Sequence, residues 1–422
     1  MSNPGANLDV ELSLCQLLNP AVMANPYPLY ARLREQDPVH WDPYLQSWVV
    51  TRYADAITVL NRFSADRAPS PEVFKALGCA ILSPIAQLMT KQMMFLDGTA
   101  HTRLRSLAAA ALTPRRVQTL HETIQAVADR LIDRIAEQGH AELLADFAEP
   151  LPSILATEIL GTPMADYRQI KAWSSDFGKM LGSIQHAAEF APQIVRSLNE
   201  AVAYFRDAIR EQETKPREGL VHSLVTAEID GARLSEEEVI ANCILLTAGS
   251  QEDVTNLIGN GMLTLLRHPE KIGSLASDAS LIPPAVEELL RYESPTQQTI
   301  RVAQDDVMLG GKPIRKGQRV VALLAAANRD PERFTDPERL DLAREDNRHL
   351  AFGWGAHFCF GAPLARLEGQ IAFNTLLRRL LNPALESDHA DWRINLSLRG
   401  LQTLPVRFNA LVPEKDSQFV SQ

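Results

Sequence analysis

At 422 residues, with 45% hydrophobic and 22% charged residues, the chain has the composition of a folded globular protein, which excludes the disordered and fibrous classes. Its formal net charge of −10 and pI near 5.6 give no overall basic field, so whole-surface binding to nucleic acid or to an anionic membrane is excluded. No basic segment leads into an apolar run near the N-terminus, and no stretch of about eighteen apolar residues occurs, so we expect neither export nor a membrane span and expect a cytoplasmic protein.

The N-terminal part of the chain predicts short helices around a pair of strands. A helical pattern follows residues 25–28, and residues 39–41 and 47–51 have the composition of paired strands. A helix is expected over residues 53–60. Residues 64–95 mix prolines and a glycine with apolar residues, which predicts a long irregular loop that carries one or two short helices.

Residues 97–275 have helical periodicity almost throughout, and we expect no strand there. The best-defined helix opens at Ser235, an N-cap with Glu238 three residues on, and is expected to run to His268. At ~1.5 Å per residue this helix is roughly 50 Å long, enough to cross the molecule. Its middle, residues 244–249, is apolar or small and is expected to be buried.

After residue 294 the composition favours strands, at residues 302–309, 317–325 and 404–408. No repeat or linker separates the parts of the chain. The sequence therefore predicts a mainly α fold with small β-sheets (α+β), one large domain over residues 1–412, and a disordered tail over 413–422.

The cysteines Cys15, Cys79, Cys243 and Cys359 are too few and too scattered for a disulfide framework or a zinc finger. Cys359 lies in the segment 352–361, which reads FGWGAHFCFG and is followed at once by a helical pattern. The glycines let the backbone approach a flat, bulky group, and the helix N-terminus stabilises a thiolate. Such a sulfur is an electron-donating ligand for haem iron and favours O–O cleavage. The alternative is a buried cysteine in a glycine-rich turn.

This segment closely resembles the haem-binding loop of the cytochrome P-450 family. All fixed positions of the family pattern are matched, by Phe352, Gly353, Gly355, His357, Cys359 and Gly361. The resemblance to soluble bacterial members extends over nearly the whole chain. It implies a cytochrome P-450 fold in which the long central helix lies over haem b, with Cys359 as the iron ligand and with Phe352 and Gly361 among the residues that contact the haem.

A second motif, glutamate-x-x-arginine on the family's K helix, is matched by Glu288 and Arg291. Three residues apart on one helical face, they can form an ion pair shared with a third group, although alone they would be read as a solvated surface pair. In the family this pair stabilises the scaffold behind the haem. The structural segment that follows in the family is matched by residues 327–331 and 334–337, Asp341 and Arg344.

Haem carries two propionates, whose burial requires cationic or hydrogen-bonding partners. The resemblance implies that these partners are His101, Arg105, Arg301 and His357. His101 and Arg105 lie four residues apart on one predicted helix, which supports a shared target. Taken singly, each would be an ordinary surface cation.

The central helix departs from the family pattern of alanine, glycine, variable residue, acid and threonine, in which the acid and threonine organise proton delivery. The flanks align without gaps only if Gly249 and Ser250 replace the alanine and glycine. Glu252 is then the acid, and Asp253 stands in the place of the threonine. Thr255 lies two residues further along and is expected to point elsewhere.

Asp253 has three interpretations at this point. It could shuttle protons as a carboxylic acid if an apolar pocket raises its pKa. It could bind a polar or cationic group of the substrate, so that a substrate hydroxyl relays protons. It could also be a tolerated substitution in a less coupled enzyme. With Glu252 and Cys359 it completes the residues that we expect to be catalytic.

The sequence has no glycine-rich strand-turn-helix fingerprint for a flavin or nicotinamide, so electrons are expected from a ferredoxin-type partner of a monomeric protein. In the family that partner docks on the cysteine side. Here five arginines could form a basic patch for it or could be scattered solvated charges, namely Arg103, Arg115, Arg116, Arg348 and Arg366.

The resemblance implies a substrate site lined by residues 68–95, 177–194, 248–253, 295–300 and 396–401. An apolar, adaptable lining is expected from Met93, Met94, Leu181, Ile184, Leu396 and Leu398. Gln297, Gln298 and Asp253 could orient a hydroxyl or amide. We therefore expect hydroxylation or epoxidation of a small, mainly apolar molecule that resembles a polyketide, terpenoid or fatty acid. The alternatives are a peroxide-driven or otherwise partner-independent haem-thiolate enzyme and a non-catalytic haem-thiolate binding module.

Overall fold

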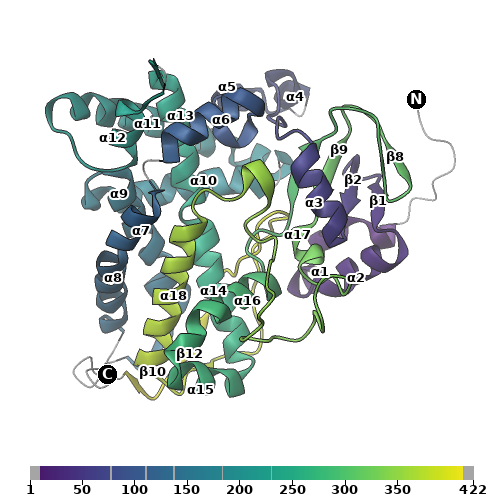
Figure 1. The fold of residues 1–422 in the computed structure, drawn as a ribbon. Helices are drawn as coiled ribbons and strands as arrows, with labels where there is room; N and C mark the ends of the chain where they lie inside the picture. The colour runs from purple at the N-terminus through teal and green to yellow at the C-terminus, as the bar shows by residue number, and fades with distance from the viewer. Residues whose placement is uncertain are drawn as a thin grey trace.

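Helices form most of the structure, and the largest β-sheet lies to one side of them (Figure 1). The computed structural model describes residues 10–76, 78–109, 112–135, 138–182, 184–229 and 231–411. The predicted mainly α fold with small sheets is confirmed. The tail expected over 413–422 lies outside the described residues.

The largest sheet joins the N-terminal hairpin to two strands from the C-terminal half. β1 (Val39–Asp42) and β2 (Ser47–Val50) pair antiparallel, as predicted. β2 runs parallel to β9 (Arg319–Ala322), which pairs antiparallel with β6 (Thr299–Val302). The sheet therefore fixes the chain around β6 against the N-terminal part of the molecule.

Two strand predictions after residue 300 are wrong in extent. The strand expected over 302–309 is split, because residues 303–306 turn the chain before β7 (Val307–Leu309), which belongs to another sheet. The strand expected over 317–325 ends at residue 322, and the helix α17 (Leu324–Ala327) follows at once. A run of β-branched and small apolar residues does not mark where a strand ends and a buried helical turn begins.

Short strands also interrupt residues 97–275, where the sequence predicts none. β3 (His140–Glu142) pairs with β12 (Pro405–Arg407), the expected C-terminal strand. A separate hairpin is formed by β4 (Glu228–Ile229) and β5 (Ala232–Arg233). Strands of two or three residues are too short for an alternating pattern to identify them, and the partner of β3 lies far along the chain.

The other elements build the helical body and its edges. α4 and α5 are the two short helices expected within 64–95, and the helix expected over 53–60 is α3. Besides α17, the helices are α1 (Pro20–Ala24), α2 (Tyr27–Gln36), α3 (Tyr53–Arg62), α4 (Pro71–Ala76), α5 (Ser83–Met89), α6 (Gly98–Ala109), α7 (Pro114–Thr119), α8 (His121–Asp133), α9 (Pro150–Leu160), α10 (Tyr167–Gly182), α11 (Ile184–Thr214), α12 (Leu220–Thr226), α13 (Glu236–Gly249), α14 (Glu252–Leu266), α15 (Pro269–Ser277), α16 (Ile282–Tyr292) and α18 (Ala362–Arg379). The remaining strands are β8 (Lys312–Ile314), β10 (Leu380–Leu381), β11 (Ala384–Leu385) and β13 (Ala410–Leu411).

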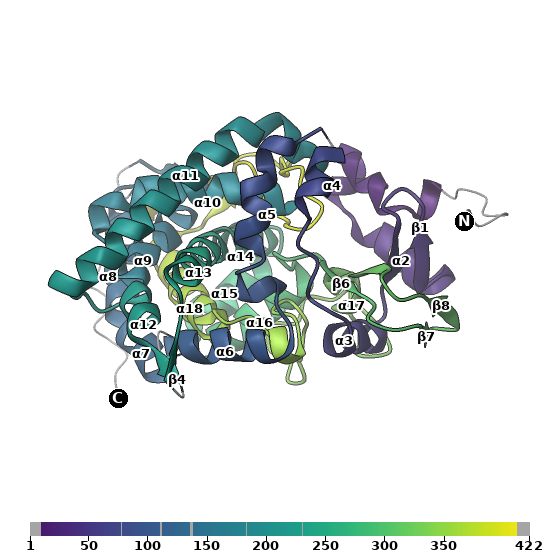
Figure 2. The same ribbon diagram turned by 90° about the horizontal axis from the view of Figure 1, so that it is seen from above.

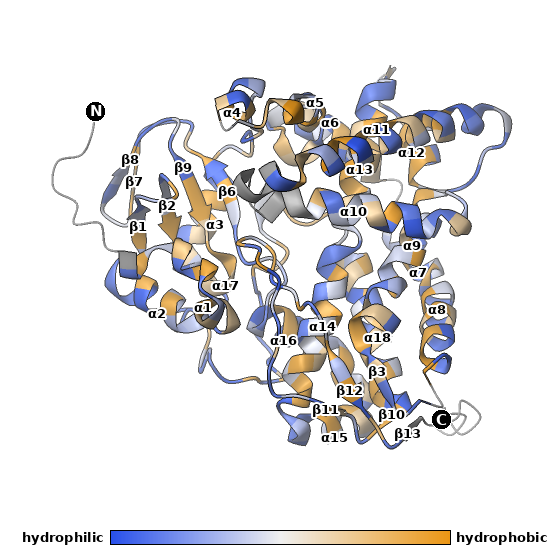
Figure 3. Cartoon of the chain, turned by 180° about the vertical axis from the view of Figure 1, so that it is seen from behind, coloured by the Kyte–Doolittle hydropathy of each residue, from blue (hydrophilic) through white to orange (hydrophobic). Residues whose placement is uncertain are grey.

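Amphipathic helices supply the core of this body. Along α8 the buried residues Ile124, Val127, Ala128, Leu131 and Ile132 recur at spacings of three and four, and Figure 3 shows polar residues on the rest of that helix. This stripe belongs to the largest hydrophobic cluster, which also contains buried residues of α14, α16 and α18. Within the described ranges, no helix combines the length and apolar character needed to cross a membrane.

The central helix begins as predicted. Ser235 caps α13 (Glu236–Gly249), where its hydroxyl accepts a hydrogen bond from the Glu238 amide at 3.2 Å and its own amide donates to Glu238 Oε2 at 2.9 Å. α14 (Glu252–Leu266) continues through the middle of the molecule (Figure 2). Residues 254–266 of α14 are all buried.

The prediction of one continuous helix to His268 is wrong, because the helix is interrupted at Ser250 and Gln251. Ser250 Oγ and Gln251 Nε2 each donate to the carbonyl oxygen of Thr247 at 3.2 Å. These bonds compete with the backbone bond that the Gln251 amide would make to the same oxygen, and Gly249 has low helix propensity. The interruption leaves Glu252 and Asp253 in the first turn of a new helix.

Candidate functional site

The cysteine loop holds Cys359 directly before α18. The Cys359 amide donates to the carbonyl oxygen of Phe352 at 2.8 Å, which closes the loop on itself. Gly353 and Gly355 have φ angles of +71° and +72°, in the left-handed region that favours glycine. A Cβ at Gly355 would also lie 2.5 Å from Oδ1 of Asn61. The loop therefore requires glycine at these two positions for its own shape.

The electrostatic surroundings distinguish Cys359 from the other buried thiols. Burial, followed by the Asp253 carboxylate, raises the pKa of Cys359 to about 11. The amides of Gly361 and Ala362 and the Arg105 guanidinium act in the opposite direction and lower the pKa. For Cys243 in α13, by contrast, burial raises the thiol pKa with no such compensation. Neighbouring amides and a guanidinium thus offset part of the cost of forming the Cys359 anion, and a metal cation on Sγ would supply the rest of the stabilisation.

The four residues expected at the propionates lie around this loop. His101 and His357 have ring centroids 4.0 Å apart, and Arg105 donates to the carbonyl oxygen of Phe358 at 2.6 Å. Arg301, on β6, donates through Nη1 to the carbonyl oxygen of Ile300 at 2.9 Å. His101 Nε2 and Arg301 Nε are buried, with no hydrogen-bond partner among the described residues. Buried polar atoms of this kind are expected to have partners, so these two atoms point to an anionic or accepting ligand.

Sequence reasoning missed a fifth cation, Arg67. It donates to the carbonyl oxygens of Ala65 at 2.9 Å and Met94 at 3.1 Å, and its guanidinium lies 4.9 Å from the centre of the Phe95 ring. Burial and the nearby Arg301 lower its pKa to about 9. Arg67 follows the irregular start of the 64–95 segment, where no periodicity or motif marks a residue as functional.

The cations near the loop outnumber their anionic partners. Burial, followed by His101 and Arg301, lowers the pKa of His357 to about 4, and the Asp97 carboxylate 3.6 Å from His357 Nε2 opposes this only in part. A planar group that carries two carboxylates would relieve this excess of positive charge. Together with the thiol and the open space beside Gly361, these residues fit an iron porphyrin with two propionates.

Glu252 and Asp253 lie together at the start of α14. Burial, followed by the Asp253 carboxylate, raises the pKa of Glu252 to about 7, and Arg393, whose Nη1 lies 3.8 Å from Glu252 Oε1, opposes the rise. Burial also raises the pKa of Asp253, while a hydrogen bond from Thr296 lowers it. Thr255 Oγ1 donates to the carbonyl oxygen of Ala148 at 3.2 Å, so the prediction that Thr255 points elsewhere is confirmed.

The side expected to receive the substrate is apolar where the structure describes it. A cavity of about 30 Å³ is lined by Ile85, Leu88, Met89, Gln92, Met94, Phe95, Phe177, Leu198, Ile244, Leu245 and Ala248. Leu181 and Ile184 lie outside the residues whose side chains are described. The suggestion that Gln297 orients a ligand is wrong, because its amide is bonded to the Tyr30 hydroxyl at 3.0 Å and to the Ser294 carbonyl oxygen at 2.7 Å.

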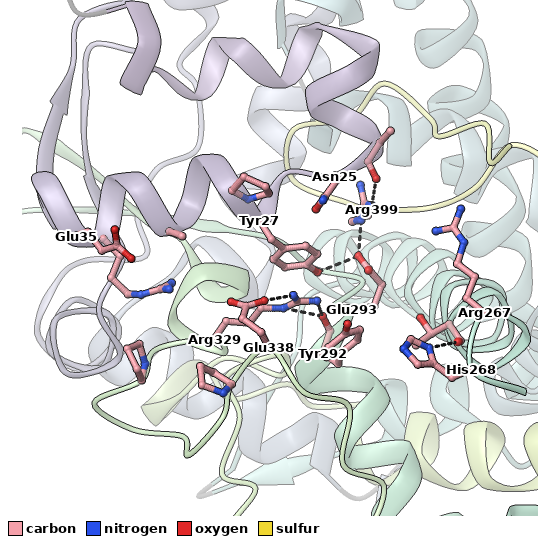
Figure 4. Close-up of a pocket in the computed structure, with 17 residues that line it drawn as sticks. Asn25, Tyr27, Glu35, Arg267, His268, Tyr292, Glu293, Arg329, Glu338 and Arg399 are labelled. Atoms are coloured by element: carbon pink, nitrogen blue, oxygen red, sulfur yellow. Dashed lines mark hydrogen bonds and ion pairs between the residues drawn. The ribbon is translucent and has the colours of Figure 1, made fainter. Parts of the chain in front are cut away.

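A larger cavity of about 670 Å³ lies between α2, the ends of α14 and α16, and Arg399 (Figure 4). No residue of the cysteine loop lines it. Its charged groups are largely bonded to one another: Glu293 accepts from Tyr27 at 2.9 Å and from Arg399, and Arg329 donates to Glu338 at 2.5 Å. We therefore interpret this cavity as part of the junction that holds the N-terminal helices to the body.

Four of the five arginines of the expected basic patch are engaged in ion pairs. Arg116 lies 3.6 Å from Glu218, Arg348 lies 3.1 Å from Asp346, and Arg103 is bonded to Glu238. Arg366 makes two bonds of 2.8 Å to Glu287. These partners reduce the positive charge that the arginines could offer to an acidic protein.

Known proteins are similar to this chain over most of its length. Residues 80–381 match the family model described as Cytochrome P450. The polyketide biosynthesis cytochrome P450 PksS of Bacillus subtilis (strain 168) is 36% identical over 395 residues, which cover 90% of this chain and 95% of that protein. The biotin biosynthesis cytochrome P450 of the same organism is 37% identical over 392 residues, or 92% of this chain and 97% of that protein.

A solved structure of P450BioI, in complex with an acyl carrier protein ligated to hexadec-9Z-enoic acid, superimposes with a TM-score of 0.85. It is 37% identical in sequence, and the match covers 92% of this chain and 99% of that chain. The matched region contains the cysteine loop, the broken central helix and the Glu288–Arg291 pair. The chain therefore belongs to the cytochrome P-450 family of haem b monooxygenases.

Proposed function

We propose that this protein hydroxylates or epoxidises a small, mainly apolar molecule in the cytoplasm, as a monomer that takes electrons from a ferredoxin-type protein. One juxtaposition carries the proposal: the Asp253 carboxylate raises the pKa of the Cys359 thiol, and Glu252 adjoins Asp253 in the first turn of α14. Oxygen insertion requires the chain to supply two groups, an iron ligand and a source of protons.

When bound, the haem supplies the activation of dioxygen and the transfer of one oxygen atom to the substrate. Cys359 would hold the iron, the cations Arg105 and Arg301 would hold the propionates, and His101 and His357 would donate hydrogen bonds to them. Phe352 accepts the Cys359 amide hydrogen bond through its carbonyl oxygen, so it holds the loop in shape, and Gly361 keeps the adjacent space free of a side chain. The apolar residues around Phe177 and Ile244 would exclude water from the substrate.

Glu252 is suited to deliver protons near neutral pH. Its pKa of about 7 lies above the ordinary value of 4.5, so the carboxyl group keeps a proton that an exposed glutamate would have lost. As the pH rises through about 7 this proton is lost, and we expect less product per NADH consumed at about pH 9 than at about pH 6. E252Q is expected to give little product at either pH and to lose the pH step.

Product and NADH consumption measured across this pH range test the role of Glu252. E158Q, which changes an exposed glutamate of α9, is the matched control and keeps the wild-type pH profile. An unchanged pH step in E252Q would show that another group delivers the protons.

Asp253 is proposed to take part in the same proton transfer. D253N keeps a hydrogen-bonding group of the same shape but has no carboxyl group that can give up a proton. We therefore expect product formation to fall at least about tenfold, with substrate affinity within about threefold of wild type. Single-turnover product yield and an equilibrium binding titration measure the two effects. If D253N had the same product yield and coupling as the wild type, Asp253 would be interpreted as a tolerated substitution for the family's threonine.

The substrate is proposed to be a polyketide-, terpenoid- or fatty-acid-like metabolite. The apolar lining of the cavity beside Phe177 supports this class. The name of one relative, in polyketide biosynthesis, and the hexadec-9Z-enoic acid on the acyl carrier protein in the P450BioI complex agree with it.

The electron donor is tested by supplying the haem-loaded protein with either ferredoxin, its reductase and NADH, or hydrogen peroxide alone. Product in the first mixture only is the expected result. Product with peroxide alone would favour the partner-independent enzyme, and no product in either mixture, over a panel of compounds that shift the haem spin state, would favour a binding module.

A further inference from the structure

The segment between α16 and β6 presents alternate side chains to two different parts of the molecule. Gln297 faces α2, where it accepts a hydrogen bond from the Tyr30 hydroxyl at 3.0 Å. Thr296 faces α14, where its hydroxyl donates to Asp253 Oδ1 at 3.0 Å. Because side chains alternate along an extended segment, Gln298 is directed to the same side as Thr296. Asp253 and Thr296 are therefore in contact, and Gln298 lies on their side of this segment.

This group of three residues, here called the polar triad, has unused hydrogen-bonding capacity. The side-chain oxygen of Gln298 is buried without a partner among the described residues, and Gln298 as a whole is 7% exposed. A carboxylate can accept about four hydrogen bonds, and Thr296 donates one to Asp253. The Thr296 proton is already engaged, so Asp253 offers acceptors, while the Gln298 amide offers both its oxygen and its N–H groups.

The triad also lies in otherwise apolar surroundings on the substrate side. Ile244, Leu245 and Ala248, on α13 and five to nine residues before Asp253, line the apolar cavity described above. Asp253 also interacts electrostatically with Cys359, so this end of α14 belongs to the same site as the thiol. A buried acceptor without a donor is destabilising, so a ligand that supplies a donor there binds more favourably than a hydrocarbon.

We infer that the polar triad of Asp253, Thr296 and Gln298 binds a hydroxyl group of the substrate, which is therefore an apolar molecule that already carries a hydroxyl close to the carbon to be oxidised. A neutral hydroxyl suits this place better than an ammonium group, because it bonds to Asp253 whether that carboxyl is charged or protonated. The inference rests on the proposed function only in assigning this space to the substrate. In a reaction sequence, a ketone reduction or an earlier hydroxylation would have to precede this step.

The test is equilibrium dialysis of the ferric, haem-loaded protein with probe pairs that differ by one hydroxyl: tetralin and 2-tetralol, limonene and carveol, decane and 1-decanol. We expect the wild type to bind the alcohol of at least one pair about tenfold more tightly than its hydrocarbon. In D253L and in Q298L that preference is expected to fall about tenfold or to reverse, with hydrocarbon affinity unchanged, since a hydroxyl buried in an apolar pocket is disfavoured.

T255V is the matched control, because Thr255 lies on the same helix and its hydroxyl is bonded to Ala148 on another side. It is expected to keep the alcohol preference. No alcohol preference in the wild type, an unchanged preference in both D253L and Q298L, or an equal loss in T255V would overturn the inference. Because dialysis needs neither electrons nor oxygen, the binding result can be interpreted even if the protein shows no monooxygenase turnover.

Discussion

C359S is expected to abolish both the thiolate-type Soret band of the reduced, carbon-monoxide-treated protein and all measurable product formation. A serine at this position keeps the backbone hydrogen bond from its amide to the carbonyl oxygen of Phe352. Its hydroxyl cannot supply an anionic sulfur to the iron. Loss of the electron-donating ligand removes the property on which O–O cleavage depends, so we expect product formation to fall by at least about 100-fold, or about 2.7 kcal/mol in the activation free energy.

C243A is the matched control for this experiment. Cys243 is fully buried in α13, and burial raises its thiol pKa, so it has no tendency to form the anion. This variant is expected to keep both the Soret band and the activity. A thiolate-type band in C359S, or its loss in C243A with haem content preserved, would contradict the assignment of the iron ligand.

The sequence predicts those parts of the site whose residues lie within one short segment of the chain. The residues 352–361 contain the proposed iron ligand, the glycines that shape the loop and His357, so the pattern could be read without knowledge of distant contacts. The register that aligned Asp253 with the family's threonine also depended on local sequence. The fold class followed from the long helical stretches, whose periodicity is the strongest signal in the chain.

The parts that the sequence does not predict depend on contacts between distant segments. Thr296 bonds to Asp253 across 43 residues of chain, and nothing near either residue indicates the other. Arg67 reaches Met94 across 27 residues within an irregular region. The interruption at Ser250 arises from side chains that compete for a single carbonyl oxygen, an effect that a periodic pattern cannot register.

The Glu288–Arg291 pair shows how burial changes the meaning of a motif. At a spacing of three residues it could be a surface pair, but both side chains are 0% exposed. Two bonds of 2.8 Å join them, and Arg344 Nε also donates to Glu288, at 3.1 Å, which confirms the shared third group. Arg291 Nη1 donates to the carbonyl oxygens of Asn328 at 2.8 Å and Pro337 at 2.9 Å. The Glu288–Arg291 pair therefore anchors the segment that leads to the cysteine loop against α16.

E288A is expected to lower the free energy of unfolding by about 3–5 kcal/mol, because it leaves the buried Arg291 and Arg344 guanidinium groups without their carboxylate. Urea denaturation at saturating haem, followed by far-ultraviolet circular dichroism, measures the change. D207A removes the exposed partner of Arg210, a pair with the same spacing, 3.4 Å apart and 72% and 68% exposed, and should cost less than about 1 kcal/mol. Equal losses in the two variants would mean that the buried pair contributes no more than a solvated one, and that another contact anchors the segment before Cys359.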